Sequence, residues 1–220
     1  AVAGLSGVTG TDVTLSADHM NLTPAKTASN QKLLQPLTPA WGISLGSPGD
    51  QASVMELGPD ELARLSAGRL VIGNASTGPI TVSQAVTLNA PQVRLVTSGY
   101  ISGGDGALTV PGQLALESAH GIGLNGTFNV TAATLAIHNA ADAVNVHSVG
   151  KLVIGTADGL DGVQSGGTVN ITASSPITVG SAIVSGGDLT LSAGESAAAG
   201  DTLTVAAPIT SAGAANRSAG

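Results

Sequence analysis

The residues whose types and spacing could do chemistry are a few aspartates, Lys151 and the four histidines of the chain. Asp158 and Asp161 lie three positions apart in a glycine-rich stretch, and Asp142 and Lys151 precede them. Clustered carboxylates with a nearby cation can act as general acid and base, the chemistry that cleaves glycosidic bonds. An aspartate beside glycine more often hydrogen-bonds its own backbone in a turn. We therefore predict turns here and no catalytic residue.

The histidines suggest a metal site as an alternative. His138 and His147 flank Asp142, and imidazole and carboxylate groups are common zinc ligands. The spacing contains no compact His-x-x-x-His pair, and isolated surface histidines are the simpler interpretation. We predict no metal site and no cofactor.

Two glycine-rich stretches resemble known binding motifs in their letters. Residues 121–126, Gly-Ile-Gly-Leu-Asn-Gly, fit a dinucleotide-binding pattern, but no amphipathic helix follows them. Residues 102–106, Ser-Gly-Gly-Asp-Gly, resemble a calcium-binding nonapeptide, but no tandem copies follow. Both stretches are predicted to be corners between short strands.

Three further alternatives are sugar binding, ice binding and the covalent attachment of glycans. Only Trp41, Tyr100 and Phe128 could stack on a sugar ring, and Phe128 is predicted to face the core. An ice-binding surface needs paired outward threonines, whereas most segments here offer one. Asn-x-Ser/Thr triplets are expected mostly by chance in such a composition, and they begin at Asn21, Asn74, Asn125, Asn129, Asn170 and Asn216.

The composition indicates a narrow, evenly filled interior. Of 220 residues, 42% are hydrophobic, but only 1% are aromatic and 10% charged.

The net charge of −7 and the scattered basic residues argue against nucleic-acid binding. Cysteine is absent, so disulfides and thiolate chemistry are excluded. No apolar run approaches the roughly 20 residues that cross a bilayer, and we expect no membrane insertion. No signal peptide is visible at residues 1–4, and the chain starts as if in mid-pattern.

The elements that must position these residues are very short strands. An apolar–x–apolar triplet, usually with Thr or Asn in the middle, places two side chains inward and one outward. Such strands are stable only where the chain coils and stacks each strand on an earlier one. Successive candidates return about every 20 residues, and they begin at Val86, Leu108, Phe128, Leu152, Val169 and Leu189. We predict an all-β parallel stack of about eleven coils.

One segment departs from this period. Pro59, Asp60 and Glu61 precede leucines three positions apart, which predicts a short helix near residues 59–65. Residues 21–66 as a whole are less regular, and we expect an elaborated coil or insertion within the stack. Residues 1–220 are otherwise predicted to form one β-helix segment, a fragment of a longer solenoid.

The stretch Glu61–Gly73, with sequence Glu-Leu-Ala-Arg-Leu-Ser-Ala-Gly-Arg-Leu-Val-Ile-Gly, is followed by Pro-Ile-Thr-Val at 79–82. Together they resemble a recurring unit of filamentous haemagglutinin-type exoproteins, which are exported by two-partner secretion. The resemblance covers essentially the whole chain and is best between about residues 5 and 90. It implies a right-handed parallel β-helix shaft used in adhesion, aggregation or toxin display. The family's secretion domain has no match here.

These observations predict a structural stalk of a large bacterial surface or secreted adhesin, located at the cell surface or outside the cell. The expected partners are neighbouring repeats of its own parent chain, an outer-membrane secretion partner during export, and surface receptors. The alternatives are a β-helix enzyme or carbohydrate-binding module acting on polysaccharide and, third, an ice- or surface-binding solenoid.

Overall fold

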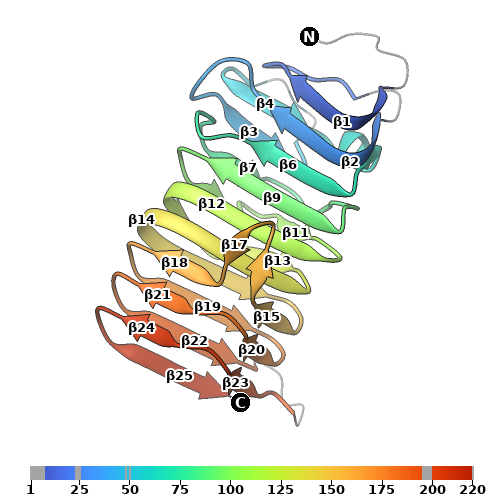
Figure 1. Cartoon of the computed structure of the whole chain (residues 1–220). Helices are drawn as coiled ribbons and strands as arrows, with labels where there is room; N and C mark the ends of the chain where they lie inside the picture. The colour runs from blue at the N-terminus through green and yellow to red at the C-terminus, as the bar shows by residue number, and fades with distance from the viewer. Residues whose placement is uncertain (1–7, 23–25, 48, 50, 195–199, 220) are drawn as a thin grey trace.

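The chain forms a parallel β-solenoid whose coils stack along one long axis (Figure 1). The structure is a computed structural model that describes residues 8–22, 26–47, 49, 51–194 and 200–219. It has about nine turns of about 22 residues each, and almost no helix. The all-β parallel stack predicted from the triplets is therefore confirmed, with fewer and longer coils than the expected eleven of about 20 residues.

Insertions and variable corners account for the longer coils. Regular steps are close to the predicted period: Ile80 pairs with Ile101, and Ile101 with Ile122. Ile43, by contrast, pairs with Ile80 across a segment that contains an extra strand and the helix. A hairpin likewise lengthens the step from Ile137 to Val163.

One side of the solenoid begins as a single column of strands and then divides (Figure 1). The undivided part stacks in the order β1 (Thr9–Ser16), β2 (Lys26–Gln35), β6 (Arg69–Gly73), β9 (Gln92–Thr97), β12 (Gln113–Ile122) and β14 (Thr134–Ser148). Beyond β14 one branch holds β15 (Leu152–Ile154), β20 (Ile177–Val179) and β23 (Leu203–Val205). The other branch holds β18 (Val163–Ser165), β21 (Ile183–Ser185) and β24 (Ile209–Ser211).

The return side carries the other parallel strands except β5 (Leu65–Ser66). One column comprises β4 (Val54–Leu57), β3 (Gly42–Leu45), β7 (Ile80–Val82), β10 (Ile101–Ser102), the end of β12, the second half of β14, β19 (Val169–Ala173), β22 (Leu189–Ala193) and β25 (Ala215–Ala219). Beside it lie β8 (Val86–Thr87), β11 (Ala107–Thr109) and β13 (Phe128–Thr131). The remaining elements are β5 (Leu65–Ser66), which pairs with the start of β2, and the antiparallel hairpin of β16 (Thr156–Ala157) and β17 (Leu160–Asp161).

The predicted helix is present as α1 (Pro59–Leu62). Proline at its first position matches the preferred start of a helix. The Glu61 carboxylate accepts the Gly58 amide at 2.9 Å and the Leu22 amide at 2.9 Å. One side chain therefore caps the helix and ties it to the chain entering β2.

The core is a set of apolar columns that run along the axis. Because each strand pairs in register with its predecessor, equivalent inward side chains stack directly on one another. In one such column every side chain is at most 2% exposed. Its members are Leu70, Val93, Leu114, Leu135, Ile154 and Val179. Full burial of one such side chain is worth roughly 1.5–3 kcal/mol, so each coil depends on the coils that cover it. Phe128 is fully buried, as its inward position predicted.

A polar column lies inside one corner. Thr97, Ser118, Asn139, Ser165 and Ser185 occupy equivalent positions in successive coils, and each is at most 6% exposed. Their hydroxyl and amide groups satisfy backbone groups where the chain leaves the strands. The Ser185 hydroxyl, for example, lies within hydrogen-bond distance of the Gly167 carbonyl in the preceding corner and of the Gly187 and Asp188 carbonyls in its own corner.

Asn139 is the centre of this column. Its Oδ1 accepts the Ser118 hydroxyl at 2.9 Å and the Gly121 amide at 2.8 Å, and its Nδ2 donates to the Asp142 carbonyl at 3.0 Å and the Ser165 hydroxyl at 3.1 Å. Because Ser118, Gly121 and Ser165 are buried, removal of the Asn139 side chain would leave them without hydrogen bonds that water cannot easily replace.

We therefore expect Asn139→Ala to lower the free energy of unfolding by about 2–3 kcal/mol, measured by urea denaturation followed by circular dichroism. Asn170→Ala is the matched control, because Asn170 is only partly buried on the outward face of β19. Similar losses for the two variants would contradict the role given to this corner.

Candidate functional site

The aspartates singled out in the sequence do not meet in a common groove. The Asp142 Oδ2 lies 3.4 Å from the His120 Nδ1. Asp161 accepts the Thr156 hydroxyl within its own hairpin at 2.6 Å. Lys151 is exposed.

Asp158 has partners that sequence reasoning missed. Lys151 is the basic residue nearest to it in the sequence, but in the structure Arg69 and Arg94, which are distant in sequence, contact Asp158. Arg69 reaches its carboxylate through Nε and through Nη2, the latter at 2.8 Å. Arg94 Nη1 donates to the Asp158 carbonyl at 3.1 Å and lies 3.6 Å from its Oδ2.

The network continues beyond this aspartate. Arg94 Nη2 contacts the Glu117 carboxylate, and Arg69 Nη1 contacts the Gln31 side-chain carbonyl. The Arg94 Nε is buried without a hydrogen-bond partner. Residues of β2, β6, β9 and β12 are thereby joined to the hairpin that carries Asp158. We call Gln31, Arg69, Arg94, Glu117 and Asp158 the arginine network.

Small side chains on the outer face of the sheet let the hairpin lie against it. Ala115 and Ala136 occupy successive coils in the same outward column as Arg94, and both are fully buried under Ala157. Leu160 packs against the same three alanines. A larger residue at either strand position would occupy the space that the hairpin fills. Figure 1 shows β17 crossing in front of the stacked strands.

The electrostatics of the arginine network favour a structural role. The hydrogen bonds from Arg69 to Asp158 raise the pKa of the guanidinium further above its ordinary value. The two arginines and the two carboxylates balance in charge, and the Asp158 side chain is only 4% exposed. The network is therefore suited to holding the hairpin in place, since its carboxylates are already paired with cations.

The histidines also separate. His147 lies 2.9 Å from the Thr172 hydroxyl through Nδ1 and 3.1 Å from the Ser174 hydroxyl through Nε2. His138 is exposed on β14, and Asp142 meets His120. Within the described ranges, no group of three or more histidine, aspartate or glutamate side chains could hold a metal ion.

The other sequence motifs resolve into corners and mixed surfaces. Gly121 and Ile122 still belong to strand β12, and residues 123–127 form the predicted corner, which leads into β13 without a helix. Gly123 has φ +67° there, and an added Cβ would lie 2.3 Å from the Asn145 carbonyl oxygen. The outward columns mix residue types, for example Val153, Thr178 and Thr204, so these positions form no regular threonine array.

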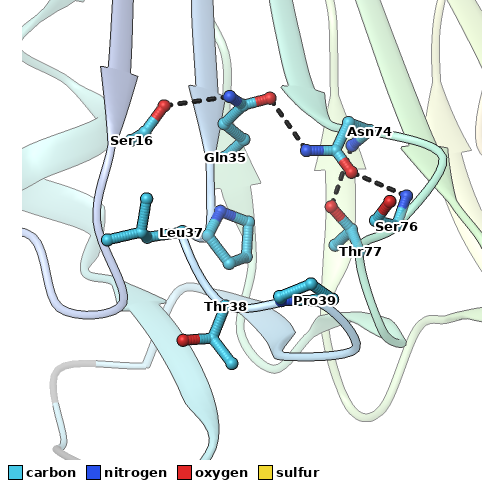
Figure 2. Close-up of a pocket in the computed structure, with 9 residues that line it drawn as sticks. Ser16, Gln35, Leu37, Thr38, Pro39, Asn74, Ser76 and Thr77 are labelled. Atoms are coloured by element: carbon cyan, nitrogen blue, oxygen red, sulfur yellow. Dashed lines mark hydrogen bonds between the residues drawn. The ribbon is translucent and has the colours of Figure 1, made fainter.

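A polar pocket of about 190 Å³ lies near the N-terminal end, between the ends of β1, β2 and β6 and the loop 36–39 (Figure 2). Figure 2 shows a row of side chains along its upper edge: Gln35 donates to Ser16 at 2.9 Å, and Asn74 donates to Gln35 at 2.8 Å. The Asn74 side-chain oxygen, Oδ1, accepts the Ser76 amide at 2.7 Å. These groups largely satisfy one another, and no carboxylate or basic side chain lines this pocket.

Asp18 holds the loop that closes the pocket. Its carboxylate accepts the Leu37 amide at 3.0 Å, the Thr38 amide at 2.7 Å and the Thr38 hydroxyl at 2.7 Å. The hydrogen bond from the Thr38 amide, followed by the one from its hydroxyl, lowers the pKa of Asp18 below its ordinary value. Leu37 is thereby held at the surface, 71% exposed.

We expect Asp158→Asn to lower the free energy of unfolding by about 2–3 kcal/mol, because the two arginines would lose their buried counter-charge. Urea denaturation measures this loss. Asp161→Asn, an exposed position in the same hairpin, should cost about 0.5 kcal/mol or less. Equal costs for the two variants would show that the arginine network does not hold the hairpin.

The Asp18 contacts should respond to acid. A carboxylate whose pKa is lowered in the folded state stabilises the fold above its unfolded pKa, and that stabilisation is lost as pH falls through the lowered value. The Thr38 amide resonance should therefore titrate between pH 6 and 2 with a midpoint below the ordinary aspartate pKa of about 3.9. The step should vanish in Asp18→Asn. A midpoint at or above the ordinary value would refute the assignment.

No family model, curated relative or solved structure matches this chain. None of the helices in the part that the structure describes is long and apolar enough to cross a membrane. The geometry of the solenoid and its surface therefore carries the functional argument.

Proposed function

We propose that this chain is a shaft segment of a large bacterial surface or secreted adhesin of the filamentous haemagglutinin type. In this role it projects other domains from the cell and offers an extended surface for weak adhesive or aggregative contacts. Its location is then the bacterial surface or the extracellular space, and its export partner an outer-membrane transporter. Catalysis, nucleic-acid binding and membrane insertion are not part of the proposal.

The observation that carries this proposal is the in-register apolar column that runs through successive coils from β6 to β20. In a stack where each coil contacts mainly its neighbours, every added coil lengthens the solenoid by about 4.8 Å. The solenoid therefore grows in proportion to the number of coils, as a shaft requires.

The use of charged side chains supports the same role. Arg69 and Arg94 are engaged by acidic partners, so they offer no free cationic surface for a nucleic acid. The acidic residues that a polysaccharide-cleaving enzyme would bring together have separate partners. The polar contacts between coils therefore favour a stiff rod over a catalytic groove.

A coil deletion tests the rod behaviour. Because Ile101 and Ile122 are ladder partners, removing residues 102–122 joins equivalent positions and shortens the stack by one coil. Because the chain lacks cysteine, the substitutions Thr14→Cys and Thr210→Cys provide two sites for spin labels, and no other residue reacts with them. Electron–electron resonance should give a label distance shorter by about 4.8 Å in the deletion.

A display experiment tests the function itself. The chain is placed between an outer-membrane anchor and a terminal binding domain, as one copy, as two copies or without it. Binding to a target on a crowded cell surface should rise with copy number and should fall to the level of weak shaft contacts without the terminal domain. Equal binding at all lengths, or full binding without the terminal domain, would contradict the shaft proposal.

A further inference from the structure

A second pocket lies on the return side, where the strands of two successive coils are interrupted. It has a volume of about 160 Å³, and its lining includes Tyr100, Asn125, Thr127 and glycines from both residues 102–106 and residues 121–126. The two glycine-rich stretches singled out in the sequence thus meet at one place. Pockets that bury drug-sized ligands measure roughly 300–1,000 Å³, so this one suits a single small ring.

Tyr100 forms one wall of this pocket. It precedes Ile101, whose ladder partners are Ile80 in the coil before and Ile122 in the coil after. The residues one position earlier in those coils are Pro79 and Gly121. Gly121 has no side chain of its own, although the Leu124 side chain lies against it, and Tyr100 is only half-buried. The Tyr100 side chain is therefore partly accessible at the pocket.

The polar groups at this pocket are unengaged, in contrast to those of the pocket in Figure 2. There Ser16, Gln35 and Asn74 hydrogen-bond to one another. Here the side chains of Tyr100, Asn125 and Thr127 make no hydrogen bond among the described residues, and only Ser102 does, with Thr81 at 3.1 Å. Asn125 and Thr127 are exposed at the rim.

We propose that this pocket binds one neutral pyranose ring of a saccharide. The C–H groups on one face of a sugar ring pack on the negative face of an aromatic ring, here Tyr100. The Asn125 amide and the Thr127 hydroxyl can then donate to and accept from sugar hydroxyls. No carboxylate or basic side chain lines the pocket, so nothing there selects a charged ligand such as phosphate.

The site goes beyond the shaft role and stands independently of it. A single ring on a single tyrosine gives an affinity on the order of millimolar. Such a site becomes effective when many copies of the chain face a polysaccharide, because each later contact is intramolecular. A shaft that carries it would hold glycan along its length.

The test is a nuclear magnetic resonance titration of the isotope-labelled chain. The probes are methyl β-glucopyranoside, methyl β-galactopyranoside, methyl α-mannopyranoside and methyl N-acetyl-β-glucosaminide, with inorganic phosphate for comparison. At least one pyranoside should shift the amide resonances of Gly103, Gly123 and Gly126 in a saturable manner, and phosphate should not.

Two variants separate binding from folding. Tyr100→Ala removes the ring, and Gly126→Leu adds a bulky side chain to the pocket lining at a position where a Cβ meets no atom within 4 Å, so the fold should tolerate it. Each should weaken binding at least tenfold. Gly150→Leu is the matched control, because Gly150 has the same open surroundings at another corner. This variant should bind the pyranosides as the unmodified chain does.

Three results would overturn the proposal. The first is the absence of shifts at these amides with all four pyranosides up to 200 millimolar, a concentration well above the millimolar affinity expected. The second is binding that survives both Tyr100→Ala and Gly126→Leu. The third is an equal or larger response to phosphate, which would make the pocket an anion site. None of these results bears on whether the chain acts as a shaft.

Discussion

The structure depends on one constraint: each coil can bury its inward side chains only against the coils on either side. A triplet such as Ile177–Val179 has two apolar side chains and too few residues to make a core alone. In-register parallel pairing solves this, because it places Leu152 and Ile177 in one column and leaves both at most 1% exposed. The narrow aliphatic interior and the near absence of aromatic residues follow from the same constraint.

The same constraint determines where polar groups can lie. Inward positions at the corner accept Thr97, Ser118 and Asn139 because the backbone there leaves the ladder and offers carbonyl and amide groups. On the outward face charged side chains pair between coils, as Arg94 does with Glu117. Polar contacts therefore reinforce the stacking direction that the apolar columns establish.

Local patterning predicted the repeated strands, the short helix and the buried Phe128, because the inward and outward alternation of a strand is visible in a few residues. It did not predict that Asp158 contacts Arg69, 89 positions away, because this depends on which coils the hairpin crosses. Two alanines in one outward column, Ala115 and Ala136, were the available signal. Lys32 is a second case: it occupies an inward column position between Val13 and Leu70 and is fully buried, with Nζ 3.4 Å from the Ser66 carbonyl.

The interruptions of the strands explain how a regular rod can acquire individual sites. Where a strand continues unbroken, as β19 does under β14, the outer face follows the ladder and offers little depth. Where it divides, the chain between the halves turns outward, and glycines at Gly104 and Gly123 permit positive φ values in that turn. Two such turns in adjacent coils enclose a hollow beside Tyr100, while the core columns beneath continue. Surface sites can therefore change at the corners without a change in the stack that makes length.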